Sequence, residues 1–170
     1  MHRRIKVIYV GGTLGMVPSA DGQGFAPGAD IPGALARLVE ESGLDLHYDL
    51  HVFDRLIDSA QTTPREWQAM ADDIQAGVGS YGGFVVLHGT DTLAFTACAL
   101  AFALTDVSAP IVLTGAQRSI IEPDSDTPAN IVGALTAASA DWSGVGVFFG
   151  DVLLAGPRAT KVSTVRPHGF

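Results

Sequence analysis

Short apolar runs alternate with helix-like segments along this chain. The runs at 5–10, 84–87, 111–113 and 145–149 are rich in β-branched and aromatic residues, which is typical of buried strands. Helices are expected between them, at about 30–42, from 63 onward, at 93–104 and at 127–138. Strands that alternate with helices predict an α/β fold: a doubly wound, mainly parallel sheet with helices on both faces.

Local signals support several of these boundaries. Thr63-Pro64-Arg65-Glu66 has the form of a capping box with proline at the first helical position. Gly43 is expected to end the first helix, and residues 152–154 are expected to form a hairpin with the strand at 145–149. Residues 17–30 are rich in glycine, proline, aspartate and serine, which predicts a mobile loop.

Composition narrows the class of protein. The 170 residues are 47% hydrophobic and 16% charged, which suits one compact domain. The formal net charge of −8 argues against a nucleic-acid partner, because an acidic surface repels phosphate. The one cysteine, Cys98, cannot form an intrachain disulfide and is expected to be buried. No apolar run is long enough for a membrane span, so we expect a soluble, cytoplasmic protein.

Three expected strands end in loops that combine glycine with threonine or alanine: G-G-T at 11–13, G-T-D-T at 89–92 and T-G-A at 114–116. The carboxyl ends of parallel strands share one edge of a sheet, so these loops are expected to converge on one crevice. Glycine lets a ligand approach the backbone, and a threonine hydroxyl can donate, accept or attack. Taken alone, Thr90 and Asp91 would more often be a helix cap, with Asp91 opening the next helix.

The strings VGGTLGM (10–16), FVVLHGTDTLAFTA (84–97), PIVLTGAQRSI (110–120) and RATK (158–161) resemble the cytoplasmic-type L-asparaginases. The resemblance covers nearly the whole chain. It implies that residues 1–170 form the family's N-terminal, nucleophile-bearing domain and that the family's C-terminal domain is absent. It also implies hydrolysis of L-asparagine to L-aspartate and ammonia, with no cofactor and no metal.

The resemblance also implies roles for individual residues. Thr13 corresponds to the usual nucleophile, while Thr90, Asp91 and Lys161 correspond to a second catalytic group. The substrate-binding positions that match the family are Gly12, Asp58, Ser59, Gly89, Thr90, Asp91, Gly115 and Ala116. Ser59 would bind the substrate α-carboxylate, and Asp91 would bind the α-ammonium. Lys161 could activate a threonine hydroxyl, which is inert without a base or proton relay.

Two departures from the family bear on activity. Many members carry a tyrosine on the lid, whereas Phe25 stands nearest that place in the expected lid at 21–27. Longer members also receive a second-domain carboxylate from a neighbouring subunit. Without the second domain we expect exposed apolar surface, and hence a homo-oligomer.

Three other functions stay open from the sequence. The first is hydrolysis of glutamine or of an amide on a larger substrate such as a misacylated tRNA, which the acidic charge disfavours. The second is a degenerate domain that binds asparagine with little turnover. The third is nucleotide binding through Gly11, Gly12 and Gly15, which the missing G-x-G-x-x-G and P-loop lysine disfavour.

Overall fold

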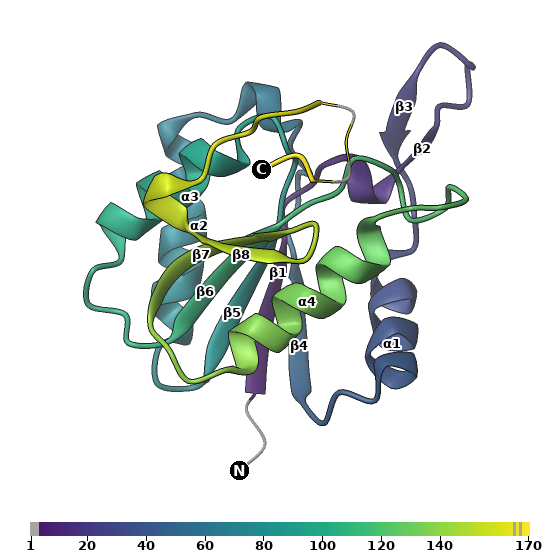
Figure 1. Cartoon of the computed structure of the whole chain (residues 1–170). Helices are drawn as coiled ribbons and strands as arrows, with labels where there is room; N and C mark the ends of the chain where they lie inside the picture. Colours follow the sequence, from purple (N-terminus) through teal and green to yellow (C-terminus); the bar gives the residue numbers. More distant parts are fainter. Residues whose placement is uncertain (1–3, 165, 167) are drawn as a thin grey trace.

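The described residues are 4–164, 166 and 168–170 of a computed structural model; residues 1–3, 165 and 167 of the predicted domain lie outside them. A six-stranded sheet forms the centre of the molecule (Figure 1). Its spatial order is β4-β1-β5-β6-β7-β8, and every neighbouring pair is parallel except β7 and β8. Its strands are β1 (Arg4–Tyr9), β4 (His47–Val52), β5 (Gly83–Leu87), β6 (Pro110–Thr114), β7 (Gly144–Phe149) and β8 (Val152–Ala155).

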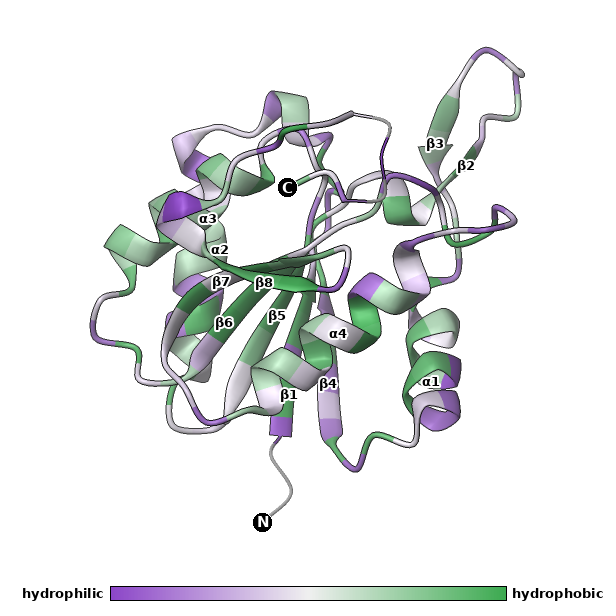
Figure 2. Ribbon diagram, viewed as in Figure 1, coloured by the Kyte–Doolittle hydropathy of each residue, from purple (hydrophilic) through white to green (hydrophobic). Residues whose placement is uncertain are grey.

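Helices cover both faces of the sheet, which confirms the predicted fold class. They are α1 (Ile31–Ser42), α2 (Pro64–Gly77), α3 (Leu93–Ala103) and α4 (Thr127–Ser139). One core cluster joins β1 and β5 to α2 and α3, and the other joins the opposite side of the same strands to α1 and α4. Because both faces are covered, every residue of β5 and β6 is buried, and Figure 2 shows these strands as hydrophobic.

The helix boundaries follow their sequence signals closely. Asp30 caps α1 by accepting from Gly33 N, and Gly43 ends the helix in the left-handed conformation with φ 65°. The capping box at Thr63 and Glu66 is present at the start of α2. The predicted hairpin also forms, since β8 pairs antiparallel with β7.

One crossover has a hand opposite to the others. The connection from β1 to β4 passes through α1. The connections through α2 and α3 run in the opposite direction along the sheet and cross its opposite face. Because both the direction and the face are reversed, these three connections have the same hand. The connection from β6 to β7 runs in the direction of α2 and α3, but α4 lies on the face of α1. Since crossovers are right-handed in about 98% of cases, the β6–α4–β7 unit is the left-handed exception.

This reversal sends the loop at 115–126 across the carboxyl edge of the sheet. There Ile120 N donates to Leu14 O at 3.0 Å, and the Ser119 hydroxyl donates to Met16 O. Leu14 belongs to the 3-10 helix η1 (Thr13–Gly15), so the loop is fastened to the segment that contains Thr13. The left-handed crossover therefore brings the loop at 115–126 next to the G-G-T loop that contains Thr13.

Three sequence expectations were wrong in detail, and one strand was not predicted. Residues 17–30 are not all loop, because β2 (Met16–Pro18) and β3 (Phe25–Pro27) pair in a hairpin that projects from the body (Figure 1). The edge strand β4 was not predicted. Asp91 does not open α3, because the helix begins at Leu93 after Thr92. Cys98 is half-buried, since it lies on the outer side of α3.

Candidate functional site

The G-G-T loop places Thr13 at the carboxyl end of β1. Gly12 has φ 102°, and a Cβ atom on it would lie 2.5 Å from Gly89 N. A larger residue would therefore push the first and second loops apart. Thr13 follows at the start of η1 and is half-buried, with its side chain on the wall of a cavity.

The second loop continues the same site. A Cβ atom on Gly89 would lie 2.5 Å from the Ser59 hydroxyl oxygen, so Gly89 is in close contact with both Gly12 and Ser59. Ser59 begins the 3-10 helix η2 (Ser59–Gln61), where Asp58 accepts from Ala60 N at 3.0 Å. The Thr92 hydroxyl donates to Ser59 O at 2.8 Å and fixes η2 against the second loop.

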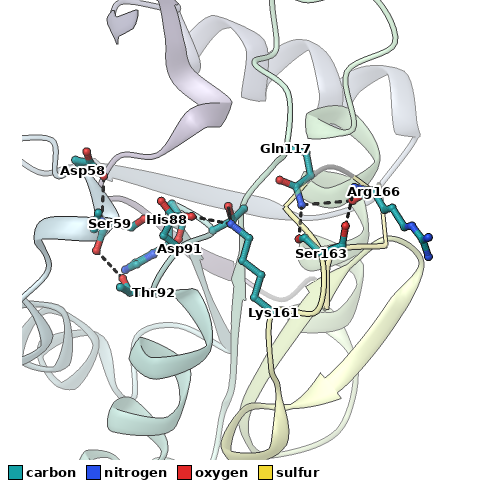
Figure 3. Close-up of polar contacts among 12 residues, drawn as sticks. Asp58, Ser59, His88, Asp91, Thr92, Gln117, Lys161, Ser163 and Arg166 are labelled. Atoms are coloured by element: carbon teal, nitrogen blue, oxygen red, sulfur yellow. Dashed lines mark hydrogen bonds and ion pairs between the residues drawn. The ribbon is translucent and has the colours of Figure 1, made fainter.

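Lys161 completes the arrangement from the far end of the chain. It follows the 3-10 helix η3 (Gly156–Arg158) and reaches back to the second loop, as Figure 3 shows. Its Nζ donates to Thr90 Oγ1 at 2.8 Å and to Asp91 Oδ1 at 2.7 Å. Lys161 is largely buried, with 16% of its side chain exposed, whereas the Asp91 side chain is 61% exposed and faces the cavity.

These residues surround a cavity of about 570 Å³, large enough for a small amino acid. The predicted site residues on its wall are Gly12, Thr13, Asp58, Ser59, Gly89, Thr90, Asp91 and Lys161. The convergence expected from the strand order is therefore present for the first two loops.

The third loop differs from expectation. Within the described chain, Gly115 and Ala116 do not line this cavity, and Gln117 does so in their place. Ala116 is buried, with 1% exposed, and Gly115 O is turned toward Asn130. The sequence string placed the loop correctly but could not tell which of its residues turns toward the cavity.

Several wall residues were missed. Met16 comes from the hairpin, Ser119 and Glu122 come from the loop at 115–126, and Thr164 comes from the C-terminal segment. Phe25, which the sequence placed on the expected lid, also lies on the wall and is 67% exposed. Ser119 and Glu122 depend on the path of the loop at 115–126, which local patterns do not fix.

His88 lies directly behind the second loop and is completely buried. Its ring contacts Gly89 O at 2.7 Å through Nδ1 and Thr96 Oγ1 at 3.1 Å through Nε2. Burial lowers the pKa of His88 from 6.5 to about 4, against the opposing effect of the Gly89 hydrogen bond. A carbonyl can only accept, so Nδ1 carries the hydrogen of the neutral ring. His88 thus supports the loop.

A second cavity, of about 830 Å³, is larger but lies elsewhere. Residues of α2 such as Asp72 and Asp73 line it together with residues that follow β4, and Asp58 is shared between the two cavities. Its wall contains none of Thr13, Thr90 or Lys161. We therefore assign the candidate site to the smaller cavity.

The described residues contain no group of three or more potential metal ligands among histidine, cysteine, aspartate and glutamate. No helix in the described part of the chain is long and apolar enough to cross a bilayer.

A family model for the N-terminal asparaginase domain matches residues 4–170. The chain belongs to the asparaginase family. It is 40% identical over 162 residues to L-asparaginase 1 of Escherichia coli K12, a match that covers 94% of this chain and 47% of that protein. The structure of the thermostable L-asparaginase from Thermococcus kodakarensis superposes with a TM-score of 0.88 at 30% identity, covering 98% of this chain and 50% of the other.

Other asparaginase-family relatives carry different names. The 60 kDa lysophospholipase of Mus musculus is 35% identical over 99% of this chain and 34% of its own length. A component of the Glutamyl-tRNA(Gln) amidotransferase of Pyrococcus horikoshii is 31% identical over 93% of this chain and 37% of its own length. The chain spans about half the length of the first relatives it matches, or less.

Proposed function

We propose that this protein is an amidohydrolase that converts L-asparagine to L-aspartate and ammonia through a threonine nucleophile and an acyl-enzyme. The observation that carries the proposal is the arrangement of Thr13, Thr90, Asp91 and Lys161 around one cavity. Family membership and the L-asparaginase relatives support the same reaction.

In the proposed complex, Ser59 binds the α-carboxylate of asparagine and Asp91 binds the α-ammonium. Both are on the cavity wall, and the Asp91 carboxylate is exposed enough to accept from a ligand. With both charged groups held, the carboxamide extends toward the G-G-T loop.

The reaction then proceeds in two stages. Thr13 Oγ1 attacks the carboxamide carbon, and its proton passes to the leaving nitrogen as ammonia departs. Backbone N–H groups near Thr13 and Thr90 stabilise the oxyanion. A water molecule then attacks the acyl-enzyme, which releases aspartate and restores the threonine hydroxyl. Lys161, Thr90 and Asp91 transfer protons as one hydrogen-bonded unit.

One observation favours a second candidate. The hairpin contributes Met16 and Phe25 to the cavity wall, and neither side chain can relay a proton to Thr13. A domain that binds asparagine with little turnover fits this arrangement. Action on glutamine or on a larger amide is a further alternative, since relatives in the family bear other names.

Ammonia release from asparagine and from glutamine by the purified protein tests the proposal. Thr13→Ala is expected to abolish turnover while the fold is retained, and Thr13→Ser is expected to retain partial activity because its hydroxyl remains. Full activity in Thr13→Ala together with loss in Thr90→Ala would transfer the nucleophile's role to Thr90. Asparagine binding without ammonia release would support the binding domain instead.

We also propose a cytoplasmic location, a homo-oligomer and no nucleic-acid partner. Residues 1–170 correspond in this proposal to the nucleophile-bearing domain. The acidic net charge of −8 supports the exclusion of nucleic acid, and the apolar outer face of α3 supports self-association.

A further inference from the structure

Asn130 is a buried polar residue that the proposed mechanism does not use. It lies in the first turn of α4, and 1% of its surface is exposed. Its Nδ2 donates to Gly115 O at 2.9 Å and to Asp126 Oδ2 at 3.2 Å, while its Oδ1 accepts from Gly150 N at 3.0 Å. One side chain therefore joins the loop after β6, the start of α4 and the turn between β7 and β8.

The first two of these contacts lead to the C-terminal segment (residues 161–164, 166 and 168–170) through Gln117. The Asp126 carboxylate accepts from Gln117 N at 2.9 Å and from Arg118 N at 2.9 Å. The Gln117 side chain in turn donates to Ser163 O at 3.2 Å and to Arg166 O at 3.4 Å (Figure 3). Asn130 thus fixes the loop from which Gln117 holds the segment.

The third contact leads to the same segment from the other side. Gly150 O accepts from His168 Nδ1 at 2.7 Å. Gly169 O then accepts from Val162 N at 2.7 Å and from Ser163 N at 3.2 Å. The backbone directly after Lys161 is therefore bonded to the part of the chain that the β7–β8 turn holds.

We infer that Asn130 is a positioning residue that fixes the C-terminal segment by these two routes and so holds Lys161 against Thr90 and Asp91. Each route begins with hydrogen bonds of the buried Asn130 amide, and removing a partner from a buried polar group costs free energy. The kinetic consequence rests on the proposed function, whereas the placement of Lys161 does not.

The placement is tested by lysine labelling. Lys6 and Lys161 are the two lysines of the sequence, and their side chains are similarly buried, with 14% and 16% exposed. Each is ion-paired, Lys6 with Asp73 at 2.8 Å and Lys161 with Asp91 at 2.7 Å. Lys6 is therefore an internal reference for acetylation rates measured by mass spectrometry of the native protein.

We expect Asn130→Ala to raise the Lys161 rate relative to Lys6 by on the order of tenfold, as expected when a buried hydrogen bond is lost and a segment opens locally. Leu135→Ala is the matched control, since Leu135 is a buried residue of α4 that belongs to the core rather than to either route. It is expected to lower stability and leave the rate ratio unchanged. An unchanged ratio in Asn130→Ala, or an equal rise in Leu135→Ala, would overturn the inference.

A second variant guards against failure of Asn130→Ala to fold. Gln117→Ala leaves the buried Asn130 in place and removes the side-chain bonds to Ser163 O and Arg166 O, so it breaks the first route and retains the second. A labelling ratio between those of the unmodified protein and Asn130→Ala is expected. A ratio equal to that of the unmodified protein would count against the inference.

Kinetics supply an independent arm if ammonia release is observed. We expect Asn130→Ala to lower kcat by roughly 10²-fold, the effect of misplacing a catalytic group by about 1 Å, with little change in KM. In a Lys161→Met background the same change should add little, because the two act through one group. Full additivity would overturn the inference. Absence of activity in the unmodified protein would defeat the proposed function alone, since the labelling result is unaffected.

Discussion

At the scale of single residues, the contact between Lys161, Thr90 and Asp91 decides most of the proposed chemistry. The Lys161 nitrogen lies 2.8 Å from Thr90 Oγ1 and 2.7 Å from Asp91 Oδ1, although the lysine is about 70 residues away in sequence. The three groups share their hydrogen bonds, so none can change its protonation or position without affecting the other two.

From this coupling we predict that Lys161→Met and Asp91→Asn each reduce kcat strongly and that the double variant loses little more. Each single change already breaks the shared unit, so the second finds little left to remove. Steady-state ammonia release is measured for the unmodified protein, the two single variants and the double variant, and the comparison gives the coupling free energy between Lys161 and Asp91. Losses that multiply fully in the double variant would show that the two residues act independently.

His88 gives a prediction about stability instead of catalysis. Its pKa is about 4 in the folded protein and has the ordinary value of 6.5 in the unfolded chain. As pH falls below 6.5, the unfolded chain binds a proton that the folded protein does not bind until about pH 4. The free energy of unfolding should therefore fall across this window, by about 3 kcal/mol for this one group.

Urea denaturation between about pH 4.5 and 7 measures this dependence. His88→Gln should flatten the curve, because glutamine does not titrate, whereas His47→Gln on the exposed edge of β4 should preserve it. Parallel curves for His88→Gln and the unmodified protein would show that His88 is not responsible.

At the scale of elements, the sequence predicts best where a local signal acts on local structure. The capping box at Thr63 and the left-handed Gly43 are chosen by nearby backbone groups, and both lie where expected. The buried strands β5 and β6 are also easy to predict from the sequence, because strands covered on both faces are continuously apolar. The edge strand β4, with the sequence HYDLHV, is half exposed and lacks that signal.

The cavity-wall residues of the loop at 115–126 could not be predicted from the sequence, and the physical reason is the crossover from β6 to β7. A right-handed connection would be the default and would put α4 beside α3. The observed placement next to α1 determines the path of the loop at 115–126, and hence that Gln117, Ser119 and Glu122 line the cavity. The motif residues Thr13, Thr90 and Lys161 therefore lie on the cavity wall as expected, while wall residues positioned by this topology were missed.

At the scale of the whole molecule, helix α3 leaves an apolar face exposed. Phe95 and Phe102 are 66% and 73% exposed and lie seven residues apart, on one side of the helix. The half-buried Cys98 lies between them on the same side. A helix that is apolar on both faces is typical of one covered by another surface.

We therefore predict that the 170-residue protein self-associates through α3, with a two-fold dimer as the commonest form of such an assembly. Light scattering at micromolar concentration should give a mass above that of one chain. Phe95→Glu or Phe102→Glu should restore a monomer, whereas Phe25→Ser, which removes an equally exposed ring from the hairpin, should not. A monomeric unmodified protein would contradict the prediction.

The final prediction concerns substrate affinity in this 170-residue protein. Asparagine carries an α-carboxylate and an α-ammonium, and each needs a partner to offset its desolvation. Ser59 and Asp91 are placed to provide one partner each. The resemblance implies that longer family members add a carboxylate from a second domain. Loss of one charge-assisted hydrogen bond weakens binding by about 1.5–3 kcal/mol, or about one to two decades.

We therefore expect a KM for asparagine well above that of the two-domain members, in the millimolar range, and a still poorer reaction with glutamine, whose extra methylene moves its ammonium away from Asp91. Steady-state kinetics with both amino acids measure this. A micromolar KM for asparagine would mean that another carboxylate within these 170 residues, or in a dimer partner, binds the α-ammonium. Glu122 is then the group to change, because it lines the same cavity and is held by Ser119 N at 2.8 Å. Glu122→Gln should in that case raise KM while leaving kcat nearly unchanged, because binding would be lost equally in the ground state and the transition state.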